Sequence, residues 1–160
     1  MSKASTGNVT VEIASLDAVE TVTQVLGEFA DKLTAQQLTV VFAPPERAVP
    51  MQADGKLTWR VFSNILSNTV KYALPGTRVY VDVEETESFV TVSVKNISRE
   101  PLNISAEELM ERFVRGDASR NTEGSGLGLN IAQSLMQLQK GSLTLTIDGD
   151  LFKTTLQFPK

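Results

Sequence analysis

Hydrophobic and polar residues alternate along several short segments, a pattern typical of β-strands with one buried face. The alternation predicts strands at residues 9–14, 38–43, 78–86, 88–96, 142–148 and 150–158. Pro44 and Pro45 end the second strand, and the third and fourth are close enough in sequence to form a hairpin. Asp148 and Gly149 are a strong turn signal, so we expect the last two strands to form a closing hairpin.

Three longer segments carry apolar residues at the spacing of a buried helix face. We expect Asp17 to cap the first helix, with Glu20 as its capping-box partner. The apolar face of this helix comprises Val19, Val22, Leu26, Phe29 and Leu33.

Asp54 is the expected cap of the second helix, which Pro75 and Gly76 end. Its buried stripe comprises Leu57, Val61, Ile65 and Leu66. The third helix is predicted from near Gly126 to about Lys140, and residues 97–125 before it are less regular. The order is therefore strand, helix, strand, helix, strand, strand, helix, strand, strand. This order predicts a two-layer α/β sandwich with one mixed, mainly antiparallel sheet and helices on one face.

Composition narrows the possible functions. The 160 residues suit one domain, and the net charge of −4 argues against non-specific nucleic-acid binding. The chain contains no cysteine and no histidine, which excludes disulfides, thiolate zinc sites and imidazole catalysis by its own residues. No apolar run approaches the ~18 residues of a membrane span, and no signal peptide is recognisable at the start.

A polar face on the second predicted helix suggests a binding site. Asn64, Asn68, Lys71 and Tyr72 follow one another at helical spacing and therefore share one face. A carboxamide oxygen can bind Mg²⁺, a lysine can contact a phosphate, and a tyrosine can pack against an adenine ring. A solvated polar helix face is the alternative interpretation.

The segment EGSGLGLNIAQSL, residues 123–135, places three glycines at the start of the last helix. Helix N-termini bind anions, and glycines let a phosphate approach the backbone closely. The segment does not fit the dinucleotide-binding fingerprint, because Leu129 occupies the position of its third glycine. A P-loop is also excluded, since Leu57 follows the only Gly-Lys pair. The alternative is a flexible hinge.

Taken together and in this order, two stretches resemble the ATP-binding catalytic domain of bacterial sensor histidine kinases, within the GHKL ATPase superfamily. FSNILSNTVKYA (62–73) is similar to the N box of that family. MERFVRGDASRNTEGSGLGLNIA (110–132) is similar to its F box, ATP lid and second glycine box in succession. The resemblance covers essentially the whole chain: residues 1–8 resemble the end of an upstream dimerisation helix, and residues 9–160 resemble the catalytic domain.

The resemblance implies a Bergerat-fold sandwich that binds ATP and Mg²⁺ under a mobile lid. It implies that Asn68 binds Mg²⁺, that Asn64 lies on the nucleotide face, that Lys71 contacts phosphate and that Tyr72 lies beside the adenine. Phe113 would pack the lid, and Arg115 and Arg120 would reach the triphosphate. The second glycine box would comprise Gly124, Ser125, Gly126, Leu127 and Gly128. Asn68, Lys71 and Arg120 are the residues implied in catalysis.

The first glycine box of the family departs from its usual pattern here. The family has Asp-x-Gly-x-Gly after a strand, and that aspartate accepts a hydrogen bond from the adenine amino group. Alignment on the strand places Asn96, Ser98 and Glu100 at these three positions. A neutral acceptor forms a weaker bond than a carboxylate, so we expect weakened nucleotide affinity. A plain solvated loop is the alternative for this segment.

The resemblance implies transfer of the γ-phosphoryl group from ATP to a histidine on a separate helical dimerisation domain of a homodimeric protein. It implies a cognate response regulator as a further partner, and a cytoplasmic domain of a membrane-bound bacterial sensor, without nucleic-acid or membrane contact of its own. Three other functions stay open: a serine or threonine kinase of the anti-sigma type, a docking module that has lost catalysis, and an ATPase of the gyrase or chaperone kind. The last needs a carboxylate where this chain has Asn64.

Overall fold

The computed structural model describes residues 10–99 and 125–160, and for residues 125–128 the backbone alone. In chain order its elements are β1 (Ala14–Asp17), α1 (Ala18–Glu28), α2 (Ala30–Ala35), β2 (Thr39–Phe42), β3 (Pro50–Ala53), α3 (Gly55–Tyr72), β4 (Arg78–Glu85), β5 (Phe89–Ile97), α5 (Ser125–Leu138), β6 (Ser142–Asp148) and β7 (Leu151–Pro159). Within these ranges, no helix has the length and hydropathy needed to span a bilayer.

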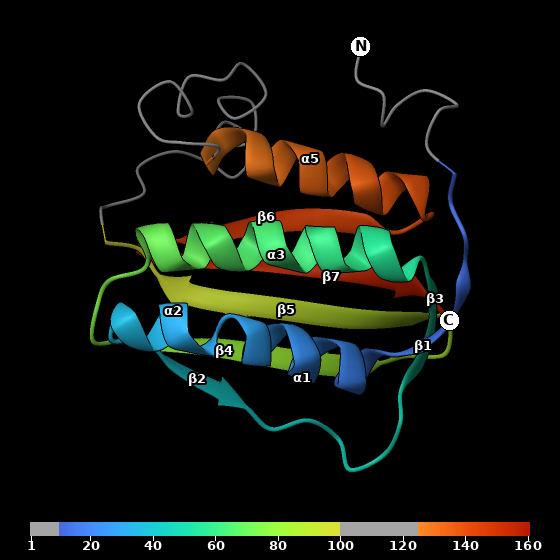
Figure 1. Ribbon diagram of the computed structural model, residues 1–160, viewed down its shortest axis with the longest axis horizontal. Coiled ribbons are helices and arrows are strands. Elements are labelled where there is room, and N and C mark those ends of the chain that lie inside the picture. Colours follow the sequence, from blue (N-terminus) through green and yellow to red (C-terminus); the bar gives the residue numbers. More distant parts are fainter. Residues whose placement is uncertain (1–9, 100–124) are drawn as a thin grey trace.

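The described elements form two layers, with α1, α3 and α5 side by side on one face of a five-stranded sheet (Figure 1). The strand order is β2-β4-β5-β7-β6, and only β2 runs parallel to its neighbour. Both predicted hairpins are present, and Gly149 adopts the positive φ (64°) that the β6–β7 turn requires. The predicted two-layer sandwich is therefore confirmed.

The core lies between the sheet and the helices. Alternate residues of β5 point toward the helix layer, where Val90, Val92 and Val94 are buried. They pack in one cluster with the buried stripe of α3, of which Val61, Ile65 and Leu66 are fully covered. The period of two in the strand and of about 3.6 in the helix explains why both faces could be predicted.

Two local predictions were wrong at the start of the chain. The first strand begins at Ala14 instead of residue 9, and it pairs with the unpredicted β3 in a separate two-stranded sheet. A four-residue strand that begins with proline gives too short a pattern to be recognised. The first helix is also interrupted at Phe29 (φ −98°, ψ 3°), which separates α1 from α2.

The predicted N-caps are confirmed for α1 and α3. Asp17 Oδ1 accepts from the backbone N–H of Val19 (3.0 Å) and also of Val49 (3.1 Å). Asp54 Oδ1 accepts from the N–H of Leu57 (3.0 Å). In the described part of the chain, Glu20 makes no side-chain hydrogen bond, so the capping box expected at α1 is incomplete there.

A buried polar network connects the start of α3 to the end of α5. Gln139, which is 1% exposed, accepts through Oε1 from the Asp54 N–H (2.7 Å) and the Thr58 hydroxyl (3.0 Å). Its Nε2 donates to the Leu135 carbonyl (3.2 Å). Since this network joins opposite ends of the two helices, α3 and α5 are antiparallel, and α5 begins beside the end of α3 (Figure 1).

Asp54 also holds the segment before β1, because its Oδ2 accepts from the Glu12 N–H (2.7 Å). Burial alone would raise the pKa of this carboxyl, but backbone N–H groups of Glu12, Leu57 and Lys56 outweigh burial and lower the pKa. The carboxylate form of Asp54 is therefore part of the folded structure at neutral pH.

Asp54→Ala is expected to lower the free energy of unfolding at pH 7 by about 2 kcal/mol, because an N-cap and the acceptor for Glu12 are both lost. The folded pKa lies below the unfolded value, so this stability is present above the unfolded pKa of about 3.9 and is lost as pH falls through the folded pKa. The wild-type advantage should be constant from about pH 7 to about pH 5 and shrink below about pH 4, measured by urea unfolding. Asp54→Asn, which keeps a capping oxygen without the charge, should show a smaller loss. An undiminished Asp54→Ala difference at about pH 3 would contradict this account.

Candidate functional site

The end of α3 and the end of β5 meet at one end of the helix layer. The Leu74 N–H donates to the Ile97 carbonyl (2.8 Å), and the Arg99 N–H donates to the Tyr72 carbonyl (2.8 Å). Ala73 and Ser98 form an isolated antiparallel bridge between these hydrogen bonds. The backbone that follows α3 is thereby hydrogen-bonded to the backbone at the end of β5.

Two buried asparagines lie on the elements that meet here. Asn68, one turn before the end of α3, is 7% exposed, and Asn96, at the end of β5, is 4% exposed. Asn96 belongs to the strand positions that point toward the helices, as Val94 does. Within residues 10–99 and 125–160, neither carboxamide makes a hydrogen bond.

Unpaired carboxamides at such burial indicate a binding site. Transfer of an amide out of water without a new hydrogen bond costs about 1–3 kcal/mol, so proteins rarely retain such groups without use. No fully enclosed side-chain nitrogen or oxygen of the described residues lacks a partner, so the atoms of both carboxamides keep an opening to solvent. Asn68 and Asn96 can therefore each offer a donor and an acceptor to a ligand.

The other predicted residues of α3 have the expected positions. The helix is continuous from Gly55 to Tyr72, so Asn64, Asn68 and Lys71 share the face that their spacing predicted. Asn64 and Lys71 are half-buried, and both take part in interactions with other residues. Tyr72, the last residue of α3, is 37% exposed and can offer an aromatic surface to a ligand.

The glycine segment begins a helix, as predicted. Ser125 is the first residue of α5, and Gly126, Leu127 and Gly128 form its first turn. This N-terminus lies at the end of the helix layer where α3 ends (Figure 1), and its free N–H groups and positive dipole favour an anion. Gly124 and the predicted lid residues Phe113, Arg115 and Arg120 lie outside the described residues.

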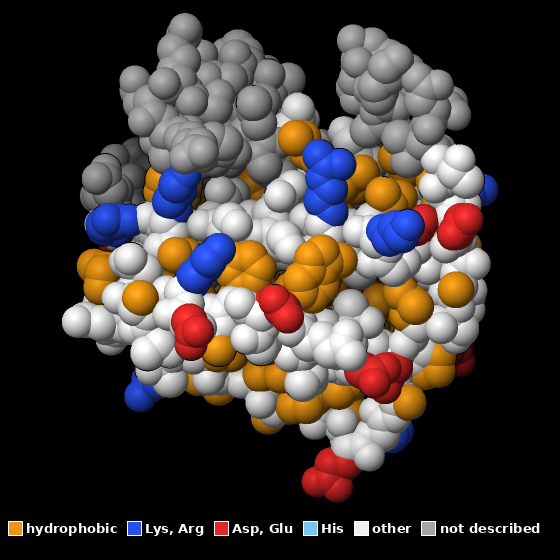
Figure 2. All heavy atoms as spheres, in the orientation of Figure 1, with side chains coloured by type: hydrophobic (Ala, Val, Ile, Leu, Met, Phe, Trp, Pro, Cys, Tyr) orange, Lys and Arg blue, Asp and Glu red, His pale blue; other side chains and the backbone are white. Residues whose placement is uncertain are grey.

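The charged residues of α3 also favour an anionic ligand. Between Gly55 and Tyr72, α3 carries Lys56, Arg60 and Lys71 and no acidic residue, whereas α1 carries Glu20 and Glu28 and no basic residue. Figure 2 shows Lys and Arg side chains along the α3–α5 side of this face and Asp and Glu mostly toward α1. A molecule with a net charge of −4 thus has one helix without acidic residues, and Lys71 is the cation that this helix carries in its last turn, at the site end.

The donor set of the described residues limits how a metal could bind. These residues contain no group of three or more Asp, Glu, His or Cys side chains able to hold a metal ion. A cation held by the Asn68 oxygen would therefore need most of its ligands from water and from an anionic ligand. Mg²⁺ accepts such a ligand set, because it keeps several waters and binds substrate phosphates.

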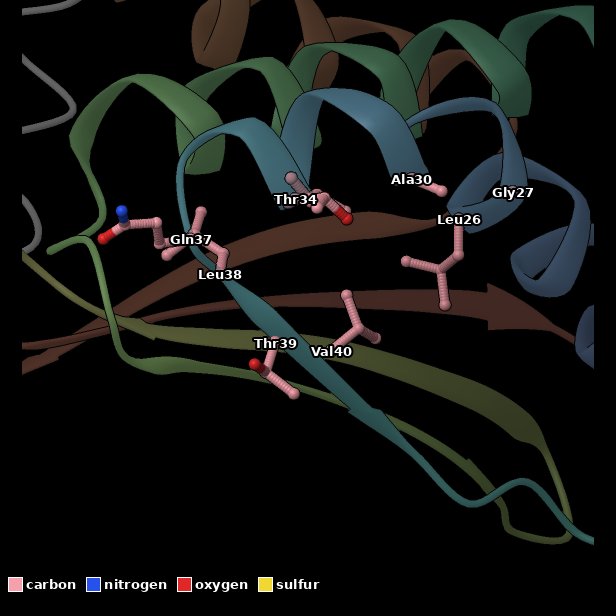
Figure 3. Close-up of a pocket in the computed structure, with 9 residues that line it drawn as sticks. Leu26, Gly27, Ala30, Thr34, Gln37, Leu38, Thr39 and Val40 are labelled. Atoms are coloured by element: carbon pink, nitrogen blue, oxygen red, sulfur yellow. The ribbon is translucent and has the colours of Figure 1, made fainter.

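An apolar groove of about 670 Å³ lies elsewhere, between α1, α2 and β2 (Figure 3). Its lining contains no charged side chain and none of the predicted site residues, and comprises Leu26, Gly27, Ala30, Leu33, Thr34, Gln37, Leu38, Thr39 and Val40. This groove has no charged side chain to meet a phosphate, so we do not assign the predicted chemistry to it.

Gln139 was not predicted as part of the site. Among the described residues its side chain makes no hydrogen bond to a predicted site residue, but its bonds to Asp54 and Thr58 connect the two helices that carry the site. The sequence held one signal, since Gln139 follows Leu135 by four residues and therefore continues a buried helix stripe with a polar side chain.

Known proteins share sequence with this chain. Residues 53–160 match the family described as histidine kinase-, DNA gyrase B-, and HSP90-like ATPase. A probable sensor protein of Escherichia coli, PcoS, is 37% identical over 98 residues, which cover 60% of this chain and 21% of PcoS. The chain therefore spans about a fifth of that relative's length.

Solved structures share the fold. The catalytic domain of histidine kinase ThkA superimposes with a TM-score of 0.80 at 21% identity, covering 93% of this chain and 96% of that domain. ThkA in complex with the response regulator TrrA gives 0.74 at 19% identity, covering 94% and 42%. Full-length ShkA in complex with AMPPNP gives 0.80 at 18% identity, covering 99% and 34%.

Asn68→Leu is expected to raise the free energy of unfolding by about 1 kcal/mol, because it removes a buried amide that has no partner among the described residues. Chemical denaturation without added nucleotide measures the change. Thr69→Val is the matched control on the next residue: its buried hydroxyl donates to the Ile65 carbonyl (3.0 Å), so its loss should lower stability by about 0.5–1 kcal/mol. Equal destabilisation by both substitutions would show that Asn68 is a structural residue.

Proposed function

This chain belongs to the histidine kinase-, DNA gyrase B- and HSP90-like ATPase family, and from this membership we propose that it is the ATP- and Mg²⁺-binding catalytic domain of a sensor histidine kinase. The observation that carries the proposal is the pair of buried carboxamides of Asn68 and Asn96, which have no hydrogen-bond partner among the described residues, at the end of the helix layer where Lys71 and the N-terminus of α5 lie. Similarity to the sensor protein PcoS supports the choice of kinase within the family.

Each described residue then has a role that its position supports. Asn96 accepts from the base at the end of β5, and Tyr72 supplies an aromatic surface beside it. Lys71 neutralises phosphate charge, and the first turn of α5 donates backbone N–H groups to the phosphates. Asn64 completes the nucleotide face of α3. Arg115 and Arg120 would add charge from the lid that Phe113 packs.

Mg²⁺ fits this site through the Asn68 oxygen, together with waters and phosphate oxygens. When bound, it would offset the charge that develops on the transferred phosphoryl group. The chain's own residues bind and orient the nucleotide and exclude water from it, and in phosphoryl transfer these contributions account for most of the catalysis.

The phosphoryl acceptor must come from outside these 160 residues, because they contain no histidine. We propose that the acceptor is a histidine on a helical dimerisation domain of the same homodimeric protein, and residues 1–8 resemble the end of a helix of such a domain. We propose a response regulator as the next acceptor. The complex of ThkA with the response regulator TrrA supports the second partner. In this proposal the chain is the cytoplasmic part of a membrane-bound bacterial sensor.

ATP with Mg²⁺ is expected to bind this chain with a dissociation constant weaker than micromolar, because Asn96 is a neutral acceptor where the family has a carboxylate. Isothermal titration calorimetry measures the affinity, and Asn68→Leu should remove most of its dependence on Mg²⁺. Gln157→Glu, on the sheet face turned away from the helices, serves as the control and should leave binding unchanged. Micromolar or tighter binding by the wild type would contradict the weakened site.

Transfer itself is tested with γ-labelled ATP. The chain alone should acquire no label, whereas the full-length protein should carry label on a histidine, identified by its acid lability. Asn68→Leu in the full-length protein should reduce labelling at least tenfold. Acid-stable label would instead indicate a serine or threonine kinase. Unchanged signalling by the full-length Asn68→Leu protein would indicate a docking module without catalysis.

A further inference from the structure

The carboxamide of Asn96 is placed to discriminate between nucleobases. Asn96 is the last of the β5 residues that alternate toward the helix layer, after Val90, Val92 and Val94, and it pairs with Phe152 of β7. The three valines are covered by the core, whereas Asn96 lies where α3 ends and the core gives way to the candidate site. Asn96 is thus the polar residue with which β5 borders that site.

No described residue fixes the orientation of this carboxamide. In residues 10–99 and 125–160, neither its oxygen nor its nitrogen is hydrogen-bonded, although the residue is only 4% exposed. The two orientations of an asparagine amide exchange a donor for an acceptor, and the surrounding hydrogen bonds normally decide between them. Here a bound ligand would decide which orientation the Asn96 amide adopts.

A carboxamide and a carboxylate differ in the bases that they accept. A carboxylate offers acceptors alone, so it binds a 6-amino group and repels a 6-oxo group. A carboxamide can turn its oxygen toward a 6-amino group or its nitrogen toward a 6-oxo group. A buried site that must leave such a group unpaired rejects the wrong ligand strongly, and a site that can pair with both discriminates little.

We propose that Asn96 makes this site tolerant of the purine 6-substituent, so that it binds 6-oxopurine nucleoside triphosphates as well as ATP. The inference rests on the proposed function, in which the base lies against Asn96. Asn96 is then the specificity-determining residue, and its neutral amide both weakens ATP binding and widens the range of substrates.

Inosine triphosphate is the sharpest probe, because it resembles ATP at position 2 of the purine and differs at the 6-substituent and the adjoining ring nitrogen. Calorimetric titration of the 160-residue chain with each nucleotide and Mg²⁺ should give affinities within about tenfold of each other. Asn96→Asp, titrated at pH 8 to keep the carboxyl ionised, should bind ATP more tightly and prefer it over inosine triphosphate by about 100-fold or more.

Two further variants separate discrimination from folding and from charge. Asn96→Leu keeps a similar volume without hydrogen bonding, so it should weaken both nucleotides and leave their ratio near that of the wild type. Gln157→Glu makes the same amide-to-carboxylate change on β7, at a strand position turned away from the helices. It should leave both affinities unchanged, and circular dichroism of all three variants reports folding.

The outcomes separate this inference from the proposed function. A wild-type preference for ATP above about 100-fold, or an unchanged ratio in a folded Asn96→Asp protein, would overturn the inference while ATP binding stands. Absence of binding by either nucleotide to wild type and Asn96→Asp alike would overturn the nucleotide site and the inference with it. A wild-type ratio within about tenfold that widens in Asn96→Asp supports the inference.

Discussion

The antiparallel alignment of α3 and α5 depends on one buried side chain, Gln139. Its oxygen accepts from the Asp54 N–H and the Thr58 hydroxyl at the start of α3, and its nitrogen donates back to Leu135 within α5. A shared acceptor inside the core leaves little freedom for one helix to slide along the other, because a shift would leave buried donors unpaired. The position of the α5 N-terminus beside the end of α3 is therefore decided at the opposite end of both helices.

At the other end of the helix layer, where the candidate site lies, the buried amides are not hydrogen-bonded to described residues. Where Gln139 satisfies its neighbours, Asn68 and Asn96 have no partners among the described residues. Burial of two amides without partners lowers the free energy of unfolding, and burial of apolar side chains in the core must offset that loss. Among the described residues, buried polar groups are thus hydrogen-bonded where α3 and α5 are aligned and lack partners where a ligand is expected. Proteins commonly accept such unfavourable groups at functional sites and compensate for them elsewhere.

Local charge explains how an acidic molecule can still receive a triphosphate. The negative charge lies largely away from α3, which carries three cations and no acidic residue between Gly55 and Tyr72. Charges farther apart than a Debye length of about 8 Å are largely screened, so Lys71, in the last turn of α3, contributes more than Lys56, in the first turn, to the field that a phosphate experiences. The backbone N–H groups of the first turn of α5 add to the same field without a charged side chain.

Periodicity alone determined most of the elements. The alternating strands, the stripe of Val61, Ile65 and Leu66, and the caps at Asp17 and Asp54 follow from local rules, and the structure confirms them. The short strand β3 and the interruption at Phe29 did not follow, because four residues and a single dihedral change leave too weak a pattern. The spacing of Asn64, Asn68 and Lys71 likewise placed them on one face of α3. That Asn96 is buried beside that helix, and that Gln139 aligns it with α5, was decided by contacts between residues far apart in sequence. A local pattern can indicate which side chains of an element are buried, but which element they meet depends on how the layers pack.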